Sequence, residues 1–163
     1  TKLKLDALDK FQGVQRRQQV LVDRADLTVI EDFGHHPTAL DLTLESLRAR
    51  YPKHRLVACF EPRSNTAARK VMQDAFREAL KQADEVFLAP PHRADKLGEE
   101  RFDSEGVAAA ITVAGKKGFA PLSNEALLAE LTALVKSDKS PRCVVFFSNG
   151  AFGGIIKKFA QSA

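Results

Sequence analysis

The chain has 163 residues, of which 44% are hydrophobic, and this size and composition predict one globular domain with a buried core. No apolar run approaches the roughly 18 residues of a membrane helix, and the N-terminus lacks a signal-peptide apolar stretch, so we expect a cytoplasmic protein with no membrane partner. The net charge of +4 arises from interspersed charges, and one tyrosine with no tryptophan offers little for base stacking, which argues against a nucleic-acid partner.

The first predicted elements are two strands, residues 17–23 and 27–33, whose short connection predicts a hairpin-like opening. Apolar residues then recur at helical spacing between residues 40 and 51, and Pro37 suits the first helical position. The rest of the chain predicts, in order, a strand at 55–62, a helix at 68–80, a strand at 85–91, a charged loop at 92–103, a helix at 104–114, a short strand at 118–122, a helix at 123–136, a strand at 142–150 and a helix at 154–161.

The alternation of strands and helices, with continuously apolar middle strands, predicts the fold class. We expect an α/β, Rossmann-like domain whose mostly parallel sheet carries helices on both faces. Cys59 and Cys143 fall in two of the apolar strands, where we expect buried, reduced thiols rather than a disulfide. Parallel sheets of this kind bind ligands beyond the carboxyl ends of their strands. The polar residues of this sequence gather at those ends, which makes that edge the candidate site.

The sequence EDFGHHP, residues 31–37, ends the second strand. A carboxylate at the position of Asp32 can accept hydrogen bonds from the two vicinal hydroxyls of a ribose. Gly34 lets the backbone turn, and His36 stands at the predicted helix cap with His35 before it, so that one imidazole can face the crevice. The alternative is structural: Asp32 accepts loop hydrogen bonds and the histidines begin the helix. Adjacent histidines rarely converge on one ion, so we expect no metal site.

Two further stretches carry arginines near the same edge. FQGVQRRQ places Arg16 and Arg17 at the start of a strand, where one can bind a phosphate while the other is solvated, or both are solvated. EPRSNT offers Arg63 as a bidentate partner for a substrate carboxylate. The alternative role of EPRSNT is helix capping by Asn65 or Thr66.

The glycine-bearing turn SNGAFGG, residues 148–154, offers Asn149 as a polar contact but matches neither the dinucleotide fingerprint nor a P-loop. The sequence contains no G-x-x-x-x-G-K-[ST], and no set of serine, cysteine and histidine indicates nucleophilic catalysis. We therefore expect no catalytic residue in this chain. Because it begins at Thr1 without a methionine, we expect a fragment of a longer enzyme.

FQGVQRRQ, EDFGHHPTAL, EPRSNT and FSNGAFGG, in this order and across essentially the whole chain, resemble the C-terminal domain of the Mur ligases. Members of that family join amino acids or peptides to UDP-N-acetylmuramate in peptidoglycan synthesis. The resemblance implies that residues 1–163 form a nucleotide- and acceptor-binding lobe, with a central ATPase domain as its partner and an N-terminal UDP-sugar domain outside this chain. It also implies ATP and Mg²⁺ as cofactors, an acyl phosphate intermediate and a cytoplasmic bacterial location.

The resemblance also implies roles for individual residues. Arg17 and Asp32 match nucleotide contacts, with Arg16 as the alternative to Arg17. The positions that match the acceptor side or line the same edge are Phe33, His35, Arg63, Ser64, Asn65 and Asn149.

Within the family, EPRSNT and SNGAFGG look most like the murein-recycling branch, which adds the tripeptide L-alanyl-γ-D-glutamyl-meso-diaminopimelate. The L-alanine-adding branch has His-Arg-Tyr where this chain has Arg63, Ser64 and Asn65, which favours the peptide. The alternatives are an L-alanine ligase, a non-catalytic nucleotide- or peptide-binding module, and a folylpolyglutamate- or cyanophycin-type synthetase. The chain by itself is expected to show neither ligase nor ATPase activity.

Overall fold

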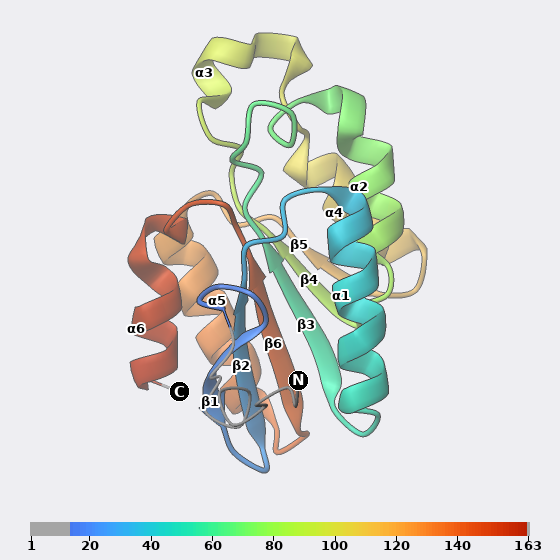
Figure 1. Cartoon of the computed structure of the whole chain (residues 1–163). Coiled ribbons are helices and arrows are strands. Elements are labelled where there is room, and N and C mark those ends of the chain that lie inside the picture. Colours follow the sequence, from blue (N-terminus) through green and yellow to red (C-terminus); the bar gives the residue numbers. More distant parts are fainter. Residues whose placement is uncertain (1–13, 163) are drawn as a thin grey trace, which may run out of the picture.

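A computed structural model describes residues 14–162 of the chain (Figure 1). Within this part, six strands form one sheet in the order β1-β2-β6-β3-β4-β5. Their bounds are β1 (Gln19–Asp23), β2 (Leu27–Asp32), β3 (Arg55–Phe60), β4 (Glu85–Leu88), β5 (Lys117–Phe119) and β6 (Arg142–Phe147). β1 runs antiparallel to β2 and every other neighbouring pair is parallel, which confirms the predicted Rossmann-like sheet with its N-terminal hairpin.

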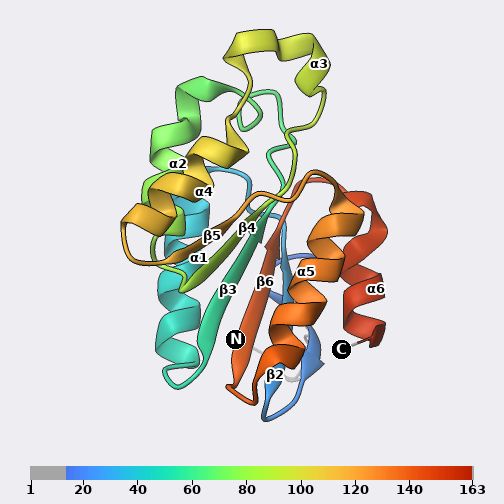
Figure 2. The same ribbon diagram turned by 180° about the vertical axis from the view of Figure 1, so that it is seen from behind.

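Helices cover both faces of the sheet. One face carries α1 (Pro37–Arg50), α2 (Gln73–Leu80) and α4 (Ser104–Val113), and the other carries α5 (Asn124–Ser137) and α6 (Ile155–Ser162) (Figures 1 and 2). The leucine stripe of α1 shows why: Leu40, Leu44 and Leu47 share one helical face and are fully buried in the first core cluster. Each such burial contributes roughly 1.5–3 kcal/mol, so the amphipathic pattern determines which face of α1 meets the sheet.

The two cysteines lie on opposite faces of the sheet, as strand alternation requires. Cys143 belongs to the core under α1, α2 and α4, and Cys59 to the core under α5 and α6. Both are buried free thiols, which confirms the expectation of reduced cysteines. Burial disfavours the thiolate, raising the pKa of Cys143 to about 12 and that of Cys59 well above its ordinary value.

The start of the second helix differs from the sequence prediction. A helix was expected from residue 68, but α2 begins at Gln73 after a 3₁₀ turn at Lys70–Met72. Ser64 Oγ accepts a hydrogen bond from the Ala67 N–H at 2.9 Å, which holds the preceding residues in a separate turn. The proposed capping by Asn65 or Thr66 is therefore wrong, and both residues are exposed in the loop.

Candidate functional site

The candidate site lies where the strands β3 and β6 end side by side. The chain after β3 leads to α2 on one face of the sheet, and the chain after β6 leads to α6 on the other, so the two connections diverge. Such a divergence leaves a ligand-binding crevice at the carboxyl edge. Glu61 and Ser148 form the floor there: each is at most 5% exposed, and Ser148 Oγ donates to the Glu61 carboxylate.

Asp32 occupies the carboxyl end of β2, beside β6. Its carboxylate is 5% exposed and accepts two backbone N–H donors, from Gln18 at 2.9 Å and from Gly34 at 2.7 Å. A Cβ at Gly34 would lie 2.8 Å from Asp32 Oδ1, so the missing side chain permits this approach. The structural alternative for Asp32, accepting hydrogen bonds from loop N–H groups, is therefore confirmed. A carboxylate has about four acceptor positions, so the two backbone donors leave capacity for ligand hydroxyls.

Arg16 and Arg17 have different surroundings. Arg16 Nε donates to Glu31 Oε1 at 2.8 Å, and Arg16 Nη2 donates to the carbonyls of Ser148, at 2.9 Å, and Gly150. Arg16 Nε and Nη2 are thus occupied inside the fold, so this side chain has a structural role and is not simply a solvated charge. Arg16 also has a left-handed φ of +58°, which a non-glycine residue adopts only under constraint.

Arg17 is exposed, and its guanidinium has no hydrogen-bond or ionic partner within the described part of the chain. Its guanidinium carbon lies 5.4 Å from the Phe33 ring centroid, a cation–π contact that leaves the N–H donors free. Of the two arginines, Arg17 therefore has more N–H donors free. Phe11–Gly13, the beginning of the FQGVQRRQ motif, lie outside the described residues.

Phe33 and His35 lie beside these arginines. The Arg16 guanidinium carbon lies 5.0 Å from the Phe33 ring centroid, and the Phe33 and His35 ring centroids lie 5.4 Å apart in an edge-to-face arrangement. His35 Nδ1 lies 3.0 Å from the Phe33 carbonyl oxygen, which can only accept, so Nδ1 carries a proton and Nε2 is available to a ligand. His36 instead caps α1, accepting from the Thr38 N–H at 3.4 Å. The two histidines therefore differ: His36 caps the helix, and His35 keeps Nε2 free of the contact that its Nδ1 makes.

A cationic hollow of about 230 Å³ opens at the same carboxyl edge, beside β3 and β4. Its lining includes the predicted residues Arg63, Ser64 and Asn65 together with Arg69, His92, Arg93 and Lys96, and no carboxylate. The His92 N–H donates to the Pro62 carbonyl at 2.9 Å, which joins the loop after β4 to the loop after β3. We refer to these lining residues as the cationic hollow.

Sequence reasoning missed the part of this hollow contributed by residues 92–97. The sequence predicts a loop there, but the stretch contains α3 (Ala94–Leu97), followed by a 3₁₀ turn at Gly98–Glu100. The available signal was a histidine, an arginine and a lysine within five residues, directly after the prolines that end a buried strand. Strands ending at the same edge bring their following loops together, so these cations belonged with Arg63.

Arg63 lies against the turn that contains Asn149 and Gly150. Arg63 Nη1 lies 3.7 Å from Glu61 Oε1, and the side chain runs so close to Gly150 that a Cβ there would lie 2.2 Å from Arg63 Cδ. Asn149 Oδ1 is buried and has no hydrogen-bond partner among residues 14–162. A buried acceptor without a donor is costly, so this oxygen marks a place where a ligand N–H or O–H is expected. Over the same residues, no group of three or more His, Cys, Asp or Glu is arranged to hold a metal ion.

Residues 16–150 match the model of the Mur ligase, glutamate ligase domain. The chain belongs to this family. UDP-N-acetylmuramate–L-alanine ligase from Hydrogenovibrio crunogenus is 32% identical over 161 residues, covering 96% of this chain and 34% of the relative. The same enzyme from Polaromonas sp. is 39% identical over 115 residues, covering 68% of this chain and 24% of the relative. The chain thus spans about a third or less of the length of these curated relatives.

Solved structures support the family at the level of fold. The murein peptide ligase from Psychrobacter arcticus superposes with a TM-score of 0.73 at 28% identity, covering 96% of this Mur ligase lobe and 31% of that chain. A domain assigned to a UDP-N-acetylmuramate:L-alanyl-γ-D-glutamyl-meso-diaminopimelate ligase from Haemophilus ducreyi has a TM-score of 0.65 at 26% identity. The match covers 90% of the present chain and 98% of that domain. A lobe of this extent has therefore been crystallised without the rest of its enzyme. No helix within residues 14–162 of the present lobe has the length and apolarity to cross a membrane.

Proposed function

We propose that this Mur ligase lobe serves an ATP-dependent ligase that joins a peptide with several carboxylates, of the L-alanyl-γ-D-glutamyl-meso-diaminopimelate type, to UDP-N-acetylmuramate. The cationic hollow carries this proposal. Arg63, Arg69, Arg93 and Lys96 line it without a carboxylate among them. Arg69 pairs with Glu100 at 3.1 Å and Arg63 lies 3.7 Å from Glu61, so four cations meet two carboxylates. Three carboxylates of a tripeptide match several cations, whereas free alanine offers one.

The neighbouring end of the crevice suits the nucleotide. Asp32 retains acceptor capacity for ribose hydroxyls, and Arg17 extends free guanidinium donors from the adjoining segment. ATP, when bound, supplies the phosphoryl group that activates the muramoyl carboxylate. Asn149 follows β6, the strand between β2, which ends at Asp32, and β3, which precedes Arg63. Its unpaired oxygen can accept a hydrogen bond from the incoming amine. Mg²⁺ would be bound by the ATP phosphates and the central ATPase domain.

The lobe closes on the central domain in this proposal, and closure excludes water from the acyl phosphate, which hydrolysis would waste. The 163-residue chain alone is therefore expected to release no ADP from ATP, with or without acceptor. Phe33, which contacts Arg17, and His35, which contacts Phe33, are assigned to the boundary between the nucleotide and the incoming amine.

The second candidate is the L-alanine ligase. Its support is the identity of the relatives, since the Hydrogenovibrio and Polaromonas enzymes are both named for alanine. An alanine site has no use for a hollow lined by several cations, which is why the peptide acceptor is preferred.

Variants of the hollow in the full-length ligase test the proposal. Arg63→Ala and Lys96→Ala should each raise the KM for the tripeptide, by about tenfold for the partly buried Arg63 and less for the exposed Lys96, and leave the KM for ATP unchanged. Lys139→Ala, an exposed cation before β6 at the opposite edge, is the matched control. Effects confined to the KM for ATP, or equal effects in the control, would contradict the assignment of the hollow to the acceptor.

A further inference from the structure

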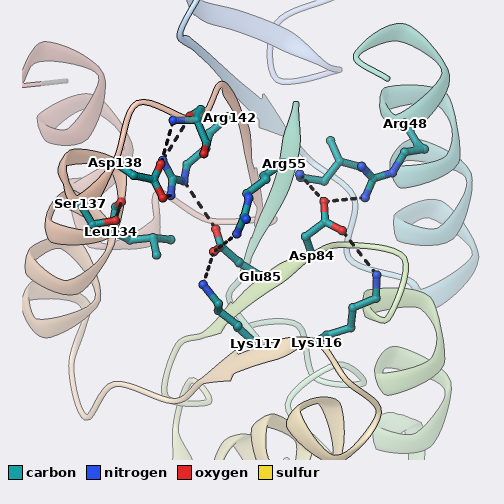
Figure 3. Close-up of polar contacts among 12 residues, drawn as sticks. Arg48, Arg55, Asp84, Glu85, Lys116, Lys117, Leu134, Ser137, Asp138 and Arg142 are labelled. Atoms are coloured by element: carbon teal, nitrogen blue, oxygen red, sulfur yellow. Dashed lines mark hydrogen bonds and ion pairs between the residues drawn. The ribbon is translucent and has the colours of Figure 1, made fainter. Parts of the chain in front are cut away.

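A second basic hollow lies at the amino ends of the strands, the edge opposite the candidate site. Its volume is about 440 Å³, and its charged lining is Arg48, Lys53, Arg55, Asp84, Lys116 and Lys117. These side chains come from the last turns of α1, the loop before β3 and the first residue of that strand, the residue before β4, and the residue before β5 and the first residue of β5. Figure 3 shows most of them converging around Asp84 and Glu85. We call this site the basal hollow.

The two carboxylates at its base do not neutralise the cations. Asp84 Oδ2 accepts from Arg48 at 2.8 Å, and its Oδ1 lies 3.4 Å from Lys116 Nζ. Glu85, fully buried, is shared by Lys117 at 3.1 Å, Arg55 at 3.6 Å and Arg142 at 3.6 Å. Each carboxylate therefore serves two or three cations (Figure 3).

Other charges leave the balance positive. Asp138 adds one carboxylate, bonded to Arg142 at 3.0 Å, and Lys53 adds one cation that has no partner among the described residues. Six cations thus meet three carboxylates, a surplus of three positive charges in a chain whose whole net charge is +4. Like charges held this close repel one another, and an anion in the hollow relieves that repulsion.

We propose that the basal hollow binds a small ligand bearing a diphosphate group. The volume falls within the range of small-molecule sites. Arg55, whose contact with Glu85 is as long as 3.6 Å, offers a planar fork that matches phosphate oxygens, and the lysines offer point charges. Arg48 adds its charge, since its terminal nitrogens already donate to His54, Gln82 and Asp84. A phosphate monoester carries about −1.5 to −2 at pH 7, so two phosphoryl groups match the surplus. This site is separate from the nucleotide and acceptor positions and does not depend on the proposed function.

The proposal is tested by titrating the 163-residue chain with inorganic pyrophosphate in 20 mM salt. Backbone amide NMR shifts locate the binding, and calorimetry measures its affinity. Saturable shifts should appear at residues 53–55 and 115–117, and affinity should fall as salt rises to 200 mM. Lys53→Glu, at an exposed position without a partner, should weaken binding at least about fivefold. Lys158→Glu, an exposed residue of α6 with the same charge change, should alter it less than twofold.

Repeating the titration with UDP and with ADP distinguishes the sources of the diphosphate. If either nucleotide shifts the amides of residues 53–55 and 115–117, the ligand is nucleotide-linked. If only pyrophosphate shifts them, the ligand is the free anion. Shifts confined to residues 63–69 and 92–97 would place the anion in the cationic hollow and overturn the proposal. Equal weakening by Lys53→Glu and Lys158→Glu would overturn it too, because that result describes an effect of net charge.

Discussion

Arg16→Ala is the perturbation that most sharply tests how the candidate site is held in shape. Arg16 connects the N-terminal segment to Ser148 and Gly150, and it also binds Glu31. A hydrogen bond from a charged donor contributes about 1.5 kcal/mol or more when buried, but the Arg16 side chain is 32% exposed, so water replaces part of it. With about 0.5–1 kcal/mol for the partly screened Glu31 pair, we expect a total loss of about 2–3 kcal/mol.

Urea denaturation of the 163-residue chain, followed by circular dichroism, measures this loss as a difference in the free energy of unfolding. Arg16→Gly is the matched variant, since it removes the same side chain but tolerates the left-handed φ of +58°. We expect the glycine variant to be about 0.5–1 kcal/mol more stable than the alanine variant. A loss below about 0.5 kcal/mol for Arg16→Ala would refute the bracing role, and equal stability of the two variants would refute the constrained backbone.

Three further predictions concern the carboxylates. In the full-length ligase, Asp32→Asn should raise the KM for ATP by roughly 10- to 100-fold, or about 1.5–3 kcal/mol, and an unchanged KM and kcat would exclude a nucleotide role. Glu85→Ala should destabilise the chain by about 1–3 kcal/mol in urea denaturation, because it removes the buried carboxylate shared by Lys117, Arg55 and Arg142 and leaves the 1% exposed Arg142 with Asp138; a loss under about 0.5 kcal/mol would contradict that. Burial works to raise the pKa of Asp84, but the Arg48 guanidinium, the Leu56 N–H and Lys116 together hold that pKa below its ordinary value. The charged Asp84 therefore stabilises the fold above the unfolded-state pKa of about 3.8, and this contribution is lost as pH falls through the lower folded-state pKa. Asp84→Asn should therefore flatten the fall in the free energy of unfolding between pH 5 and 2. Parallel curves of unfolding free energy against pH for the variant and the parent chain would contradict this.

The sheet and its covering helices could be predicted from local pattern because burial acts through short periodicities. Continuous apolar runs identified β3, β4 and β6, and the leucine stripe identified α1. The insertion of β6 between β2 and β3 is different, since no local signal says which strand the last one joins. The predicted start of α2 was wrong for a related reason. A hydrogen bond that Ser64 Oγ accepts and a β-bridge between Arg69 and Arg101 hold the residues before α2 in a separate turn.

The candidate site divides in the same way. Asp32, His35 and Arg63 could be singled out because polar residues at the ends of apolar strands stand out in sequence. The function of Arg16 could not be predicted, because its Ser148 partner is 132 residues away. The unpaired oxygen of Asn149 and the gathering of His92, Arg93 and Lys96 beside Arg63 likewise depend on which loops the fold brings together.

The central claim is that this lobe selects an acceptor with several carboxylates. The most direct test is acceptor-dependent ADP release by the full-length ligase, comparing kcat/KM for L-alanyl-γ-D-glutamyl-meso-diaminopimelate with that for L-alanine under saturating ATP and UDP-N-acetylmuramate. If the cationic hollow receives the acceptor, the tripeptide should be preferred by at least about 100-fold, equivalent to roughly two charge-assisted hydrogen bonds. A preference for L-alanine would contradict the account and assign the lobe to the alanine-adding ligases.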